Sequence, residues 1–121
     1  MATHPYDATV DPPLPVLPVV VRGVDRREAV TLVGVADTGA DVTVVPEEVA
    51  RRLLVASGTR TIVGVGGPAR SAVAYRAEIA VDGRTELVDV IGWGVETIVG
   101  RDLLNGRRAT FDGPRLVLEL D

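Results

Sequence analysis

Short apolar runs, most of them rich in valine, alternate along the chain with turns built from glycine, proline and aspartate. Valine favours the pleated, half-buried surface of a strand. Two-residue or glycine-rich turns between neighbouring runs, such as Asp82-Gly83, indicate hairpins. The pattern predicts strands over residues 16–24, 28–35, 42–45, 60–65, 71–81, 84–91, 95–99, 109–111 and 115–120.

Only two segments have the pattern of a helix. Residues 46–54 open with Pro46, carry acids in the first turn and arginines in the last, and place Val49 and Leu53 on one face. Residues 102–105 predict a second short helix, which Gly106 ends. Many short strands and two brief helices predict a mainly β domain, barrel-like or a sandwich, over residues 14–121. The proline-rich residues 1–13 predict a flexible or loosely docked N-terminal arm.

Composition narrows the chemistry. The 121 residues suffice for one domain, and 46% are hydrophobic. Aromatic residues make up 3%, and 13 basic against 17 acidic residues give a net charge of −4, which argues against a nucleic-acid partner. All basic residues are arginine, cysteine is absent and His4 is the sole histidine, so lysine, thiol and triad chemistry are excluded. Carboxylate, hydroxyl and backbone chemistry remain.

Two further sequence features bear on location. The N-terminal prolines interrupt the one candidate signal peptide, and no apolar run approaches the roughly 20 residues that span a bilayer. We therefore expect a cytoplasmic protein without a membrane partner.

The segment most suited to chemistry is Asp37-Thr38-Gly39-Ala40-Asp41, which directly follows an apolar strand. These residue types are also ordinary turn formers, so a plain turn is the alternative. The strand would deliver a carboxylate to the sheet edge, and the glycine permits the sharp turn that holds it there.

Three segments, in this order, resemble the retropepsin-like family of aspartic proteases. They are the loop at residues 35–41, the glycine-rich Ile62-Val63-Gly64-Val65-Gly66-Gly67, and Ile98-Val99-Gly100-Arg101-Asp102-Leu103-Leu104. The resemblance spans roughly residues 16–120. It implies a small closed barrel-like acid-protease fold that is active as a homodimer.

The resemblance implies that Asp37 is the catalytic carboxylate of an aspartic endopeptidase that acts on peptides or proteins. The chain has one such motif, so the second carboxylate would be the Asp37 of another subunit. One acid would activate a water and the other would protonate the scissile carbonyl, with no metal or cofactor. The alternative is a weakly active or inactive retropepsin-like module for dimerisation or peptide binding.

Other loop residues take roles from the same resemblance. Thr38 would hydrogen-bond across the dimer axis, and Gly39 would allow close approach of the substrate. Ala40 lacks the hydroxyl that pepsin-like relatives direct at the catalytic carboxylate, so we expect activity at mildly acidic to near-neutral pH. Asp41 and Arg101 would form an ion pair that ties the loop to the second helix, and the alternative is two solvated charges that contribute little. If that pair is buried, losing one partner would cost about 3–5 kcal/mol.

The glycine-rich segment would form a mobile flap over the substrate, and its alternative is an ordinary hairpin turn. Its residues are Gly64, Val65, Gly66 and Gly67. The cleft wall would include Trp93, Val95 and Ile98, although a core position is equally expected for Trp93 and is favoured for Ile98. The last hairpin departs from the retroviral pattern, and pairing of terminal strands between subunits is the expected dimer contact.

Overall fold

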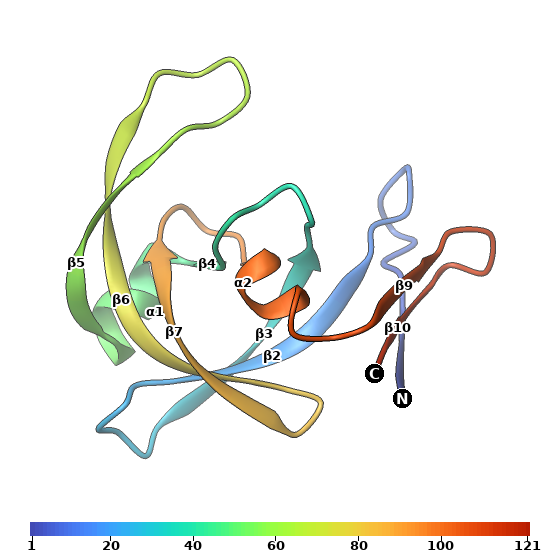
Figure 1. The fold of residues 1–121 in the computed structure, drawn as a ribbon, viewed down its shortest axis with the longest axis horizontal. Helices are drawn as coiled ribbons and strands as arrows, with labels where there is room; N and C mark the ends of the chain where they lie inside the picture. The colour runs from blue at the N-terminus through green and yellow to red at the C-terminus, as the bar shows by residue number, and fades with distance from the viewer.

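The computed structural model describes residues 1–121 and contains two β-sheets (Figure 1). The larger sheet has the order β2-β3-β8-β4-β7-β6-β5 and the smaller one the order β1-β10-β9. The strands are β1 (Ala2–Pro5), β2 (Val16–Arg22), β3 (Ala29–Ala36), β4 (Val44–Val45), β5 (Val55–Ile62), β6 (Arg70–Val81), β7 (Arg84–Gly92), β8 (Ile98–Val99), β9 (Ala109–Asp112) and β10 (Val117–Leu120). The helices are α1 (Glu47–Leu53) and α2 (Arg101–Leu104). The predicted mainly β class with two short helices is confirmed.

The larger sheet curls but does not close into the barrel that the sequence predicts. Strand β2 pairs with β3 along its whole length and also pairs with β6, from Val20–Ala80 to Arg22–Glu78. The weak point lies between β4 and β8, which are two residues long and share a single residue pair, Val44 with Ile98. One residue pair is too short a ladder to complete a barrel wall.

The core lies inside the curled sheet. Strand β2 alternates buried Leu17, Val19 and Val21 with outward residues, which places the exposed Pro18 on the outer side. Strand β6 contributes Ala77, Ile79 and Val81 to the same core. Helix α1 covers it with Ala50 and Leu53, both fully buried. Neither α1 nor α2 has the length and apolar character of a membrane-crossing helix.

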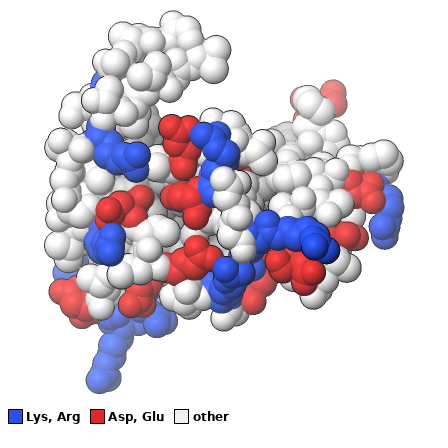
Figure 2. All heavy atoms as spheres, in the orientation of Figure 1, with Lys and Arg blue, Asp and Glu red and all other residues white.

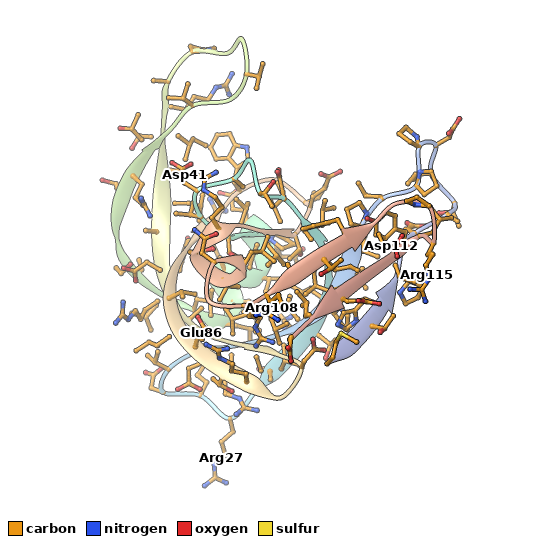
Figure 3. All side chains as sticks on the ribbon, turned by 45° about the vertical axis from the view of Figure 1, so that its right-hand side comes forward. Arg27, Asp41, Glu86, Arg108, Asp112 and Arg115 are labelled. Carbon is orange, nitrogen blue, oxygen red and sulfur yellow. The ribbon has the colours of Figure 1, made fainter.

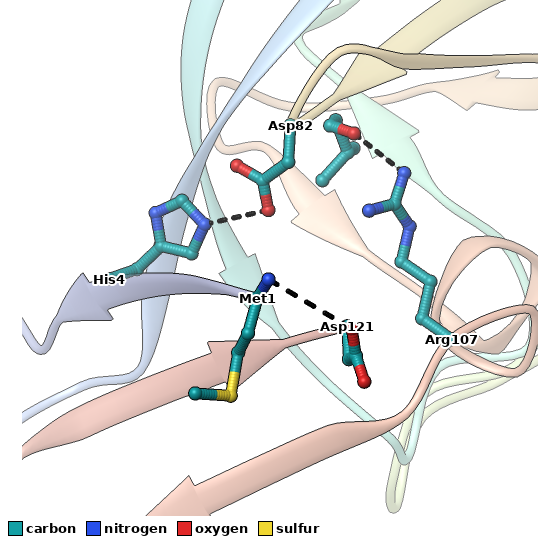
Figure 4. A network of polar contacts seen from close by, with 6 residues as sticks. Met1, His4, Asp82, Arg107 and Asp121 are labelled. Atoms are coloured by element: carbon teal, nitrogen blue, oxygen red, sulfur yellow. Dashed lines mark hydrogen bonds and ion pairs between the residues drawn. The ribbon is translucent and has the colours of Figure 1, made fainter.

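The N-terminal residues 1–13, for which the sequence predicts a flexible or loosely docked arm, include a strand that pairs with the C-terminus. Strand β1 pairs antiparallel with β10, from Ala2–Leu120 to Pro5–Val117. His4 Nε2 lies 3.0 Å from Asp82 Oδ2 and links β1 to the β6–β7 turn, and the Met1 amino group lies 4.0 Å from Asp121 (Figure 4). The two chain ends therefore lie side by side (Figure 1).

Strands β5 and β6 form a hairpin whose tip projects from the body (Figure 1). Strand β5 begins at Val55 and ends at Ile62, earlier at both ends than the predicted 60–65. The tip at residues 63–69 is exposed, and the Val65 side chain is fully exposed. Gly66 has a φ of +71°, the left-handed region that glycine adopts without strain, and the Gly67 N–H donates to the Gly64 carbonyl.

Candidate active site

Asp37 lies where β3 ends, on a loop that backbone hydrogen bonds fix in place. Its N–H donates to the Val99 carbonyl at 3.0 Å, and its own carbonyl accepts from the Ala40 N–H at 3.2 Å. Its carboxylate Oδ1 accepts the Gly39 N–H at 2.8 Å. A Cβ on residue 39 would lie 3.0 Å from that oxygen, so glycine leaves the carboxylate uncrowded. The half-buried Asp37 keeps Oδ2 without a hydrogen bond from the chain.

A buried polar link joins the end of this loop to α2. Thr43 is fully buried, and its hydroxyl donates to Asp102 Oδ1 at 2.8 Å while accepting the Gly100 N–H at 3.1 Å. The Thr43 N–H donates to Asp102 Oδ2 at 2.9 Å. Asp102 Oδ1 also accepts the Leu103 N–H, so both carboxylate oxygens are satisfied. This arrangement fixes the loop to the first turn of α2.

Gly100 permits the close approach that this link requires. A Cβ there would lie 2.6 Å from the Val42 carbonyl carbon and 2.7 Å from its oxygen. Backbone atoms cannot swing aside as a side chain can, so any larger residue would push the loop away from α2. The neighbouring Arg101 N–H donates to the Ala40 carbonyl at 2.8 Å across the same junction.

Arg101 and Asp41 form the ion pair expected from the sequence, with 2.6 Å between Arg101 Nη2 and Asp41 Oδ1. Arg101 Nη1 also donates to the Thr38 carbonyl at 2.7 Å. The Asp41 side chain is 79% exposed, so the pair is not the buried one for which a loss of 3–5 kcal/mol was expected. Water screens it, and its contribution falls to about 0.2–1 kcal/mol.

A groove of about 210 Å³ lies between this loop and the projecting hairpin. Its apolar side chains include the half-buried Val42, Val44 and Ile62 and the fully buried Ile91. Gly39, Ala40 and Asp41 form its wall on the loop side, and Arg60, Thr61 and Val63 form the wall on the hairpin side. Figure 3 shows Asp41 beneath the hairpin. The groove therefore begins beside the Asp37 loop and has an apolar floor.

The remaining predicted residues are divided among different places. Trp93 is 40% exposed and lines a second groove with Ile62, Gly64, Gly67 and Pro68 of the hairpin. Val95 lies apart from both, 88% exposed beside α1, in an open charged hollow of about 500 Å³. Ile98 is half-buried in β8, where it pairs with Val35.

Thr43 and Asp102 are the site residues that sequence reasoning missed. A signal for Thr43 was present, because a polar residue inside the run Val42–Val45 must find a hydrogen-bond partner if the run is buried. Asp102 entered the sequence analysis only as the first residue of the second predicted helix and as a member of the third matching segment. The 59 positions that separate these residues hide their contact from a local pattern.

No protein-family model and no curated protein sequence matches the chain. Solved structures do match it. Equine infectious anaemia virus (EIAV) protease complexed with the inhibitor HBY-793 is 26% identical, with a TM-score of 0.55, over 77% of this chain and 86% of that one. The retroviral protease-like domain of Ddi1 from Leishmania major is 18% identical, with a TM-score of 0.56, over 89% of this chain and 88% of that one.

Foamy virus provides a third match. Its protease-reverse transcriptase in complex with an RNA/DNA hybrid is 22% identical, with a TM-score of 0.60, over 78% of this chain. The chain spans only 12% of that longer protein. The first two neighbours are a retroviral protease and a retroviral protease-like domain, and this chain has the retropepsin-like fold.

Proposed function

We propose that the protein is an aspartic endopeptidase whose active site forms between two copies of the chain, each contributing Asp37. The observation that carries the proposal is the Asp37 carboxylate itself. It stands on a fixed loop with one oxygen held by the Gly39 N–H and the other available, next to an apolar groove. The retropepsin-like fold supports an aspartic-protease module.

The second carboxylate of an aspartic protease has no source within one chain. Two other acids lie in this region, and both are engaged. Asp41 pairs with Arg101, and Asp102 is bound by Thr43 and by the Leu103 N–H. A two-fold axis that passes beside the loop would bring two copies of Asp37 together with identical surroundings.

The chemistry then follows from two carboxyl groups about 3 Å apart. They share one proton, because two like charges at that distance cannot both form. The ionised acid takes a proton from a water between them. That water attacks the carbonyl carbon of the peptide, and the protonated acid donates to the carbonyl oxygen. The acid that took the proton of the water passes it to the leaving nitrogen, and the other acid takes back a proton from one hydroxyl of the intermediate. The C–N bond breaks, leaving a carboxylic acid and an amine, and the two acids again hold one proton.

Two neighbouring features fit this arrangement. The Thr38 side chain is exposed and makes no hydrogen bond within the chain, which leaves its hydroxyl free for a contact across the axis. The projecting hairpin carries Gly64, Val65, Gly66 and Gly67 at its exposed tip, and we assign it the covering role of a flap. A flap that closes excludes water from the reacting groups.

The test uses the wild type and an Asp37→Asn variant incubated with unfolded casein, with the oligomeric state followed by analytical ultracentrifugation. We expect a dimeric wild type that cleaves casein, and a dimeric variant slower by on the order of 10³-fold or more. Asp25→Asn, an exposed acid in the β2–β3 turn, is the matched control and should retain full activity. A dimer that binds peptides without cleaving them at any pH would favour the binding-module alternative, and a monomer that cleaves would overturn the two-chain site.

The pH profile supplies a second measurement. Ala40 offers no hydroxyl to Asp37, so we expect the maximum at mildly acidic to near-neutral pH. Ala40→Ser would add a donor that favours the ionised acid, and the acidic limb of kcat/KM should move to lower pH. A wild-type maximum at about pH 2–3, between the two apparent values of pepsin, would contradict the role given to Ala40.

A further inference from the structure

The groove beside the Asp37 loop has the size of a site for one side chain. Its volume of about 210 Å³ is smaller than the roughly 300–1,000 Å³ that small-molecule sites occupy. Ile91 forms part of its lining, packed against the buried Ala72 and Ala74 of β6. Partly buried Val42, Val44 and Ile62 pack on this cluster. An aliphatic side chain would cover the exposed parts of Val42, Val44 and Ile62, whereas a charged one would lose its hydration.

The charge of the groove comes from Arg60. Strand residues two apart share a face, so Arg60 and Ile62 lie on the same side of β5, and Arg60 is paired with Ala72 of the buried cluster. Arg60 forms no ion pair or side-chain hydrogen bond in the structure, and residues 55–73 contain no Asp or Glu. The hairpin tip shows only uncharged atoms (Figure 2).

The acids near the groove do not neutralise Arg60. Asp41 is the one acid among the groove residues, and its charge is balanced by Arg101 at 2.6 Å. Asp37 carries the catalytic role proposed above. Arg60 is therefore a cation of the groove without a carboxylate partner.

We infer that Arg60 is a specificity-determining residue. The preferred substrate is an extended peptide that carries an aliphatic residue and, two positions before or after it, Asp or Glu. The spacing comes from the hairpin, because Ile62 and Arg60 are two residues apart on one face, and alternate side chains of an extended peptide repeat at the same interval. This inference rests on the proposed function, since it names the substrate class of the same site.

The test compares three synthetic peptides that share one aliphatic residue, valine, and differ two positions away, where they carry Asp, Asn or Lys. We expect wild-type kcat/KM to be highest for the Asp peptide, by about tenfold over the Lys peptide, a modest ratio because Arg60 is exposed to water. Arg60→Gln should equalise the three, and Arg60→Glu should reverse their order. Arg27→Glu is the matched control. Arg27 is also exposed and in no ion pair, lies at the far end of the molecule from the hairpin (Figure 3), and its variant should keep the wild-type order.

Calorimetric binding of the same peptides to the Asp37→Asn variant separates this inference from the proposed function. Suppose that the wild type cleaves none of the peptides, that the Asp37→Asn variant binds the Asp peptide more tightly than the other two, and that adding Arg60→Glu to this variant reverses the order of affinity. The endopeptidase activity then fails, and the specificity stands. If the peptides are cleaved or bound without preference, or if the preference persists in both Arg60 variants, the role of Arg60 is overturned.

Discussion

The Asp37 loop and the β5–β6 hairpin lie on opposite sides of one groove and are held in different ways. The loop is fixed by backbone bonds to Val99 and Arg101 and by the buried Thr43–Asp102 link. Beyond the pair of Ala74 with Ile91, where β6 leaves β7, the hairpin has only the ladder between β5 and β6. That ladder ends at the pair of Ile62 with Arg70, and the tip beyond it is exposed. Polar bonds that are shielded from water resist displacement, whereas a two-stranded ribbon without a packed face bends easily.

The difference would serve the two requirements of the peptide-cleaving site proposed above. Reacting groups must be held within a fraction of an ångström, which the loop supplies through hydrogen bonds from Gly39 and to Val99. A long substrate must enter and leave, which requires one wall to move. Matched substitutions in the two regions test whether the stability of the fold is divided in the same way.

The largest effect is expected for Thr43→Val. It leaves the buried Gly100 N–H without an acceptor and removes a donor from the Asp102 carboxylate, at a cost of about 2–3 kcal/mol in the free energy of unfolding. Urea denaturation at one fixed protein concentration measures it. The same substitution at Thr59, exposed on the hairpin, should change stability by no more than about 0.5 kcal/mol. Equal costs at the two threonines would refute the contrast.

Glycine substitutions give the second test. Gly100→Ala forces a methyl group against the Val42 backbone and should cost about 1–3 kcal/mol. Gly64→Ala, at the hairpin tip, meets nothing within 4 Å and should stay within about 0.5 kcal/mol. Thermal unfolding of the two variants provides the comparison, and a Gly100→Ala protein as stable as the wild type would show that the loop can move away from α2.

A smaller effect is expected at the rim of the loop. A double-mutant cycle with Arg101→Gln and Asp41→Asn should give a coupling energy of about 0.2–1 kcal/mol, because Asp41 is 79% exposed. The coupling should also weaken as salt is added, since ions screen exposed charges. A coupling of several kcal/mol, unaffected by 1 M salt, would mean that dimerisation buries the pair.

The smallest effect concerns a second threonine–aspartate bond, this time exposed. The Thr9 hydroxyl donates to Asp7 at 2.6 Å and its N–H donates at 2.9 Å, and these bonds hold the pKa of Asp7 below its ordinary value. The stabilisation they give is complete above the unfolded-state pKa and is lost as the pH falls through the lowered value. Thr9→Val should raise the pKa of Asp7 in an NMR titration, with only a slight change in stability. If the pKa of Asp7 does not change in this variant, the backbone N–H of Thr9 alone lowers it.

Local patterns predicted most of the strands and both helices. Asp82-Gly83 places the β6–β7 turn correctly, and the charges of residues 46–54 predict α1 to within a residue at each end. The start of β5 was missed because residues 55–59 include small and polar residues, and their β structure comes from pairing with β6. Strand β1 was missed for the same reason, since its partner β10 lies at the other end of the chain.

The candidate site was also predicted only where its residues follow a local motif or the family resemblance. The residues at 37–41 are contiguous and could be found as a motif. The resemblance to retropepsin-like proteases predicted that Arg101 pairs with Asp41, and the structure contains that ion pair. The Thr43–Asp102 link depends on a fold that brings together residues 59 positions apart. The exposure of Asp41, which sets the strength of its ion pair, is likewise a property of the folded surface and not of the residue type.

Ile62 forms part of the lining of both grooves, one next to Asp41 and the other next to Trp93. A ligand side chain that packs on Ile62 in the first groove should change the lining of the second groove, which Trp93 shares. Since Trp93 is the only tryptophan of the chain, its emission spectrum is a built-in optical signal for occupancy of the neighbouring groove, without any attached dye.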